Sequence, residues 1–169
     1  MKNSLIVLFL SLLFLQCKEE PQILFEMPYR VDFEITAGLN PFDAHYFNSP
    51  NINSKVDTLF SVHNVDQNEI ISIQPHIGRL STVFNDVDYD FVRDISVRIY
   101  NDDPDDFREI FYRDELPLNT KGDIDLLPTL TDIQDFVKND QFNIIVRFEF
   151  RNAPPEFIQS RLDYSFEVK

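Results

Sequence analysis

Apolar and polar residues alternate with period two over five stretches of the chain, the pattern of a strand with one buried face. These stretches are 30–35, 71–84, 95–99, 142–150 and 162–168. In the second stretch the apolar parity shifts at Gly78, which predicts a β-bulge or a bend at that glycine. The chain as a whole is therefore expected to be built mainly from strands.

The charges on the last two stretches predict how these strands pair. If residues 142–150 and 162–168 form a hairpin, one register sets Arg147 opposite Asp163 and Glu149 opposite Arg161. Moving the register by one side-chain repeat in either direction sets like charges against each other, which is destabilising. We therefore expect a hairpin in the charge-matched register, with residues 152–155 in its loop.

Two segments have helical rather than strand spacing. The apolar residues of 52–63 fall on one face of a helix, and Asn53 or Ser54 is expected to cap it. Residues 131–134 fit a capping box ahead of Phe136. Many strands with such short connections predict an all-β fold over residues 29–169, a Greek-key β-sandwich with one or two short crossover helices.

The first residues have the layout of an export signal. Lys2 supplies one positive charge ahead of the apolar run Leu5–Leu15. A membrane-spanning helix needs roughly 20 apolar residues, so this run suits a secretory signal better than a stable anchor. Residues 1–16 are expected to be a signal peptide. Cys17, the only cysteine of the chain, comes next and begins a tether over residues 17–28.

This segment resembles a bacterial lipoprotein signal peptide, with Cys17 where the modified cysteine belongs; Gln16 departs from the pattern, which favours a small residue there. Lys18, Glu19 and Glu20 look like the short tag that sends Bacteroidetes lipoproteins to the outer face of the outer membrane. The resemblance implies a palmitate-bearing, lipid-anchored protein of the cell surface, held stably because several acyl chains anchor where one does not. The alternative is that Cys17 ends an uncleaved signal anchor.

Charge and composition limit the classes of partner. The net charge of −14 repels phosphate backbones and excludes nucleic acid as a partner. A single cysteine rules out an intramolecular disulfide, so the domain must be stabilised by packing, for which 17 Phe and 6 Tyr are available. Contact with the membrane is expected through the lipid alone.

One acidic stretch suggests a cation. Asp86, Asp88 and Asp90 alternate as the oxygen ligands of a calcium loop do. The stretch fails the EF-hand pattern, since Phe91 and Val97 stand where glycine and glutamate belong. Calcium is the only cofactor that the sequence suggests, and the alternative is that these carboxylates are solvated residues of a turn.

The sequence shows no motif of a zinc site or of the common enzyme classes. His45, His63 and His76 share no metal-ligand spacing, and no G-x-S-x-G elbow or glycine-rich phosphate loop is present, so an enzyme is not expected. Aromatic residues outside the strand parity are candidates for exposed rings that could bind a glycan. They are Tyr46, Phe47, Tyr89, Tyr100 and Tyr112.

Residues 37–47 and 160–166 resemble segments of uncharacterised flavobacterial lipoproteins, a group with no known activity. The sequence is therefore interpreted as a surface lipoprotein that acts as a binding or assembly module, with a glycan or an outer-membrane protein as its partner. Two alternatives stay open: a non-enzymatic subunit of an outer-membrane complex, and a hydrolase that uses a pair of carboxylates.

Overall fold

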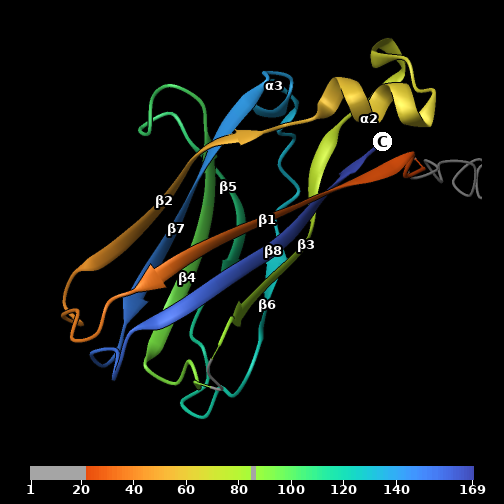
Figure 1. Ribbon diagram of the computed structural model, residues 1–169. Helices are drawn as coiled ribbons and strands as arrows, with labels where there is room; N and C mark the ends of the chain where they lie inside the picture. Colours follow the sequence, from red (N-terminus) through yellow and green to blue (C-terminus); the bar gives the residue numbers. More distant parts are fainter. Residues whose placement is uncertain (1–21, 85–86) are drawn as a thin grey trace, which may run out of the picture.

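The computed structural model describes residues 22–84 and 87–169, in which eight antiparallel strands form one nearly closed sheet (Figure 1). The strands are β1 (Phe25–Ile35), β2 (Ala44–Asn53), β3 (Ile73–Thr82), β4 (Val92–Tyr100), β5 (Arg108–Arg113), β6 (Ile124–Pro128), β7 (Gln141–Phe150) and β8 (Ile158–Val168). Their order in the sheet is β1-β8-β3-β6-β5-β4-β7-β2. The expected all-β fold is confirmed.

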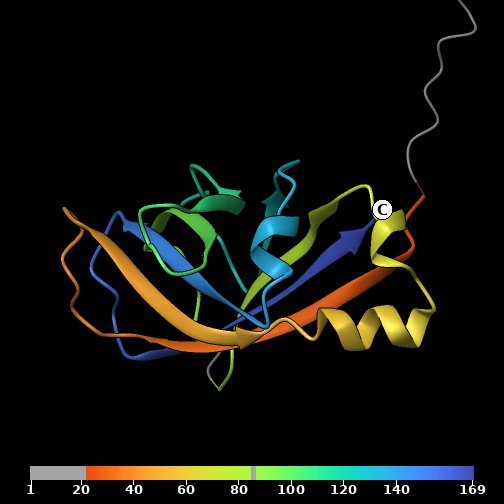
Figure 2. The same ribbon diagram turned by 90° about the horizontal axis from the view of Figure 1, so that it is seen from above.

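The strands β1 and β2 are the two ends of this order, and they run along the same side of the molecule (Figure 2). The hydroxyl of Tyr29 on β1 donates to the main-chain oxygen of Ser54, just beyond β2, over 2.6 Å. The ring centroids of Phe33 and Phe47 lie 5.3 Å apart. Side chains therefore close the gap that the backbone ladder leaves between the two strands.

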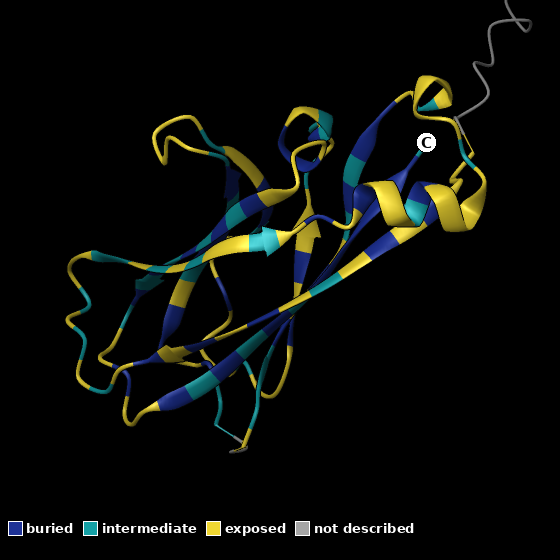
Figure 3. Ribbon diagram, turned by 45° about the horizontal axis from the view of Figure 1, so that its top comes forward, coloured by how far each residue is buried: buried dark blue, intermediate teal, exposed yellow. Residues whose placement is uncertain are grey.

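Buried and exposed residues alternate along the strands, as the sequence pattern predicts (Figure 3). The inward side chains of β7 are at most 1 % exposed; they are Phe142, Ile144, Val146, Phe148 and Phe150. Burying a large apolar side chain contributes about 2–3 kcal/mol, so this strand is a main source of the core's stability.

The predicted hairpin between β7 and β8 is wrong. β7 pairs with β2 and β4, and β8 pairs with β1 and β3. Arg147 lies opposite Tyr46 and Ser96 rather than opposite Asp163. The chain between the two strands, residues 151–157, crosses from one half of the sheet to the other, so each strand becomes an inner strand with two other partners.

Charge matching does hold, but between other strands. Asp163 lies between Arg30 of β1 and Arg79 of β3, and its Oδ1 accepts from Arg30 Nε over 2.6 Å. Arg161 lies opposite Asp32 and donates to both of its carboxylate oxygens, over 2.8 and 2.9 Å. Opposite charges therefore face each other between β8 and its neighbours β1 and β3, and not between β8 and β7 as predicted.

The predicted bulge lies close to its expected place. The register of β3 against β8 shifts between Pro75 and Ile77, which leaves His76 as the extra residue. Gly78 has a different role: a Cβ atom built on it would lie 2.8 Å from the Phe111 ring. The glycine is required by a close approach between β3 and β5, and the bulge before it changes the parity.

Both predicted helices are present but begin later than expected. α2 spans Val56–His63, since Ile52 still belongs to β2. Its N-cap is Lys55, with φ 53°, and neither Asn53 nor Ser54 caps it with a side chain. Asn53 Oδ1 instead accepts from the main-chain N–H of Lys55 over 2.9 Å.

The second helix, α3, is Gln134–Val137, and the short 3-10 helix η1 is Gln67–Glu69. The side chain that bonds the first turn of α3 is Asp132, whose Oδ1 accepts from the N–H of Gln134 over 3.1 Å. The predicted capping box is thus replaced by an aspartate two residues before the helix. Among the described residues, no helix has the length and apolar character needed to cross a membrane.

Candidate functional site

Four loops gather at one end of the sheet. They are residues 36–43, 83–91, 114–123 and 151–157, and together they are called the distal loop face; residues 85–86 of the second loop are outside the described part. Pairing of Ile35 with Ile158, and of Val92 with Phe150, brings these strand ends together. The described chain enters β1 at the other end of its 11 residues, roughly 33 Å away at about 3.3 Å per residue.

Each of the four loops exposes one large apolar side chain. These tip residues are Phe42, Phe84, Leu118 and Phe157, which are 93, 83, 76 and 61 % exposed. Other exposed apolar side chains lie on strands, on α2 and at the opposite end, for example Tyr46 and Val62. Single exposed apolar residues are ordinary on a protein surface, but one on each of four adjoining loops is typical of an interaction surface.

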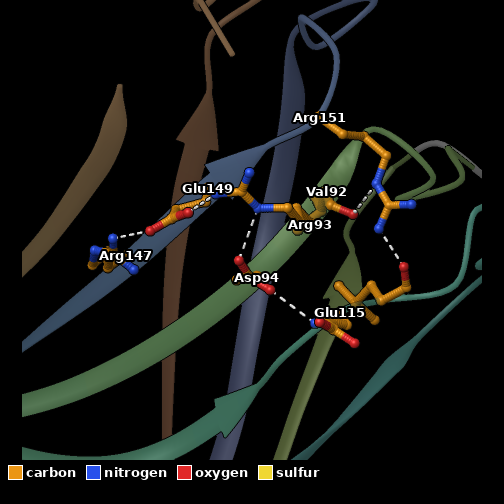
Figure 4. A network of polar contacts seen from close by, with 8 residues as sticks. Val92, Arg93, Asp94, Glu115, Arg147, Glu149 and Arg151 are labelled. Atoms are coloured by element: carbon orange, nitrogen blue, oxygen red, sulfur yellow. Dashed lines mark hydrogen bonds and ion pairs between the residues drawn. The ribbon is translucent and has the colours of Figure 1, made fainter. Parts of the chain in front are cut away.

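Arg151 holds three of these loops together (Figure 4). Its main-chain N–H donates to the oxygen of Phe91 over 2.8 Å, and its Nε donates to the oxygen of Val92 over 3.1 Å. A second guanidinium nitrogen donates to the main-chain oxygen of Leu116. One half-buried side chain thereby fixes the ends of loops 83–91 and 114–123 against loop 151–157.

A second group of charges lies beside this brace on β4 and β7 (Figure 4). Glu149 accepts from both Arg93 and Arg147. Arg93 Nε also donates to Asp94 Oδ2 over 2.9 Å, and Asp94 Oδ1 accepts from the main-chain N–H of Glu115 over 2.8 Å. Ion pairs near the surface stabilise little, so the main effect of this group, in whose ion pairs only Arg93 is exposed, is to orient the start of loop 114–123.

The loop 36–43 is built around Asn40. Its Oδ1 accepts from the main-chain N–H groups of Phe42 and Asp43, over 2.9 and 3.0 Å, which is an Asx turn. The N–H of Gly38 donates to the oxygen of Pro154 over 3.0 Å, and its φ of +74° suits glycine. The turn points Phe42 outward, and the bond to Pro154 ties this loop to 151–157.

The distal loop face is acidic. Its described acidic residues are Asp43, Asp88, Asp90, Asp114, Glu115, Asp123 and Glu156, and its described basic residues are Lys121 and Arg151. The guanidinium of Arg151 is engaged with main-chain oxygens. The apolar tips therefore stand in a negative field, which attracts a positively charged surface and repels anionic ones.

The residues predicted to carry the lipid and the export tag, Cys17, Lys18, Glu19 and Glu20, lie outside the described residues. Asp86 of the calcium candidate lies outside them too. Asp88 is half-buried and Asp90 is exposed, on either side of the buried Tyr89. Within residues 22–84 and 87–169, no three His, Cys, Asp or Glu side chains are arranged to hold a metal ion.

The three histidines lie apart. The ring of His45 stacks on Phe150 at 5.1 Å, and that of His63 on Phe25 at 4.5 Å. His76 lies between two carboxylates of β1 and β8. Each histidine therefore has a structural environment of its own.

The aromatic candidates divide into exposed and buried rings. Tyr46 is exposed as expected, and Phe47 and Tyr112 are half-buried. Tyr89 and Tyr100 are buried, so the expectation that they form exposed rings is wrong. Tyr89 can be buried because its hydroxyl bonds to Ser81 and Ser160 inside the sheet, and that of Tyr100 bonds to Asn48.

Sequence reasoning missed the tip residues because a phenylalanine is assigned to the core by default. Their neighbours carry a usable signal. Pro41 and Asp43 flank Phe42, and Pro117 and Asn119 flank Leu118. Large apolar residues set among such turn-forming residues cannot follow strand parity, which marks them as loop tips.

Sequence comparison with protein families and with curated proteins finds no relative. No protein-family model matches the chain, and no curated protein sequence matches it significantly.

Proposed function

We propose that this protein is a surface lipoprotein, anchored to the outer membrane through Cys17, which acts as a binding or assembly module and docks a protein partner through its distal loop face. The observation that carries the proposal is the set of four tip residues, one on each adjoining loop. The anchor would hold the end where β1 begins, and the tips lie at the other end. Such a molecule presents its docking surface away from its own membrane.

The charge of the face supports a protein as the occupant. Its carboxylates disfavour nucleic acid and anionic lipid headgroups. A protein with apolar sockets inside a basic rim complements both the tips and their surroundings. Leu118 and the three phenylalanines would serve as anchors, since buried aromatic and aliphatic groups at the centre of an interface carry much of the binding energy.

The hydrogen bonds that fix the loops also support docking of a protein partner. Ordering a flexible loop on binding costs conformational entropy, and a loop that is already fixed avoids this cost. Arg151, Asn40 and Asp94 fix the loops through bonds to main-chain groups. The tips are thus held in place before a partner arrives, which suits a recurrent docking function.

The proposal is tested by the size of the native assembly. Full-length lipoprotein is extracted from membranes in mild detergent and separated on a density gradient. We expect wild type to sediment with its partner, and the variant Phe42→Ser/Phe84→Ser/Leu118→Ser/Phe157→Ser to sediment as the free protein. The control is Tyr46→Ser/Val62→Ser, which removes exposed apolar side chains that lie outside the distal loop face.

The outcomes separate the alternatives. Wild type that sediments as the free protein, or a four-tip variant that keeps the assembly, would contradict docking through this face. Retention of the assembly through high-salt washing would favour a permanent subunit of an outer-membrane complex over a transient binding module, because salt screens the acidic contribution.

A further inference from the structure

The outer face of β1, β8 and β3 carries a shallow groove, away from the distal loop face. It consists of two hollows of about 460 and 360 Å³ that share Pro28, Tyr29 and Asp163 in their walls. The first extends to Lys55 at the start of α2, and the second extends to Ile77 on β3. Together they offer room for a small extended ligand.

The second hollow has an unpaired hydroxyl in its wall. Ser165 lies opposite Pro28 on one side and Ile77 on the other, so a small residue sits between two larger ones. Ser165 is only 6 % exposed, and its Oγ has no hydrogen-bond partner among the described residues. A buried hydroxyl without a partner is costly, and a polar ligand atom that reached it from the hollow would remove this cost.

Most of the charged residues that line the groove are cations, although the chain is strongly acidic. Arg30, Lys55 and Arg79 face a single acid in its walls, Asp163. Arg30 Nε donates to Asp163 over 2.6 Å, and Arg79 Nε donates to Asp125 over 2.8 Å. Each guanidinium has five N–H groups, so most remain available, and Lys55 forms no ion pair with any described residue.

We infer that this groove binds a ligand that carries a carboxylate. The guanidinium of Arg30 and the ammonium of Lys55 match a carboxylate in charge and in donor geometry. Pro28 and Ile77 provide apolar walls for the adjoining part of the ligand, and the hydroxyl of Ser165 bonds to a further polar atom. An acidic sugar and the C-terminus of a peptide both present this chemistry. The inference is independent of the proposed docking at the loop tips.

Calorimetry on the full-length lipoprotein in detergent tests the inference with three probes: digalacturonic acid, trialanine and trialanine amide. We expect one of the two carboxylate probes to bind and trialanine amide not to bind. Which carboxylate probe binds shows whether the natural ligand is an acidic sugar or the C-terminus of a peptide. Lys55→Met should weaken binding about tenfold, as loss of a charge-assisted hydrogen bond does. Lys138→Met, at an exposed lysine directly after α3, should bind like wild type.

Ser165→Val is a second variant that separates loss of binding from loss of the fold. The larger side chain fills the hollow and suits a strand, so we expect a melting temperature no lower than that of wild type together with loss of binding. The inference is overturned if neither carboxylate probe binds, if the amide binds as tightly as the acid, or if Lys55→Met or a folded Ser165→Val retains full affinity.

Discussion

The guanidinium Nε of Arg151 donates to the main-chain oxygen of Val92 over 3.1 Å, from the loop after β7 to the first residue of β4. This bond joins a loop and the start of a strand that are far apart in sequence. With the second bond to Leu116, it makes one loop residue responsible for the arrangement of three of the four loops of the distal loop face. The docking proposal therefore depends on a side chain that no partner needs to touch.

Replacing Arg151 by alanine should destabilise the domain. The change removes charge-assisted bonds and leaves the buried oxygens of Val92 and Leu116 without this donor, for which we expect a loss of about 2–4 kcal/mol. Equilibrium unfolding in urea measures it. Arg151→Lys should restore only part of the loss, because an ammonium group cannot reproduce the fork that reaches both oxygens.

The matched control for Arg151 is Arg108→Ala. Arg108 is exposed and pairs with Asp106 over 3.2 Å, an interaction expected to contribute less than about 1 kcal/mol. Equal midpoints of unfolding for Arg151→Ala and Arg108→Ala would show that the brace does not stabilise the loops.

A second prediction concerns Gly78. An added Cβ would lie 2.8 Å from the Phe111 ring, which is fully buried and cannot move freely, so Gly78→Ala should cost about 1–3 kcal/mol. The double variant Gly78→Ala/Phe111→Leu should be less destabilised than the sum of its single variants, because leucine makes room for the methyl group. Ser81→Ala on the same strand, which adds no volume, is the control. If the free energies lost in the two single variants add up to the loss in the double variant, as measured by unfolding in urea, this steric explanation is contradicted.

A third prediction concerns alkaline pH. Burial raises the pKa of Tyr89 from its ordinary value of 10.0 to about 12, and burial also raises the pKa of Tyr29 and Tyr164. Above pH 10.0 the unfolded chain loses phenolic protons that the folded chain retains. The free energy of unfolding is therefore unaffected by these groups below pH 10.0 and falls as pH rises toward 12, by about 1.4 kcal/mol per pH unit for each group.

The contribution of Tyr89 is measured by unfolding at several pH values between 10 and 12. Tyr89→Phe should make the fall in the free energy of unfolding with pH less steep, by the contribution of one titrating group. The variant also loses the bonds to Ser81 and Ser160, which lowers stability by about 1 kcal/mol at neutral pH. Tyr46→Phe, at an exposed ring, is the matched control. An equally steep decline in Tyr89→Phe and wild type would contradict the assignment.

A fourth prediction concerns the anchor. Cells fed a clickable palmitate analogue should label the wild-type protein and leave Cys17→Ala unlabelled, because the thiol is the proposed site of acylation. Protease added to intact cells should cut the wild-type protein if it is held on the outer surface. Labelling of Cys17→Ala would refute the anchor, and complete resistance of wild type to the protease would refute surface exposure.

Strand parity could be predicted from the sequence because it is a local property. A residue such as Phe148 is apolar between the polar neighbours Arg147 and Glu149, and any partner strand buries the same face. The pairing of β7 could not be predicted. Arg147 forms its ion pair with Glu149 on its own strand. It therefore needs no acidic partner on β8, and its charge does not determine which strand lies next to β7.

The path of the chain after β7 decides the topology, and it depends on long-range contacts. The bonds from Arg151 to the oxygens of Val92 and Leu116 involve main-chain acceptors, which every residue has and no sequence pattern reveals. The distal loop face was missed for a related reason. Phe42 and Phe157 count as core residues until the strands that end beside them are known.

The most direct test of docking through the distal loop face is photocrosslinking in living cells, with benzoylphenylalanine placed singly at Phe42, Phe84, Leu118 and Phe157, and at Tyr46 and Val62 as exposed controls. We expect all four tip positions to crosslink to the same protein and the two control positions to give no crosslink. Crosslinks to lipid alone, equal crosslinking at the controls, or no crosslink at any tip would contradict docking through this face.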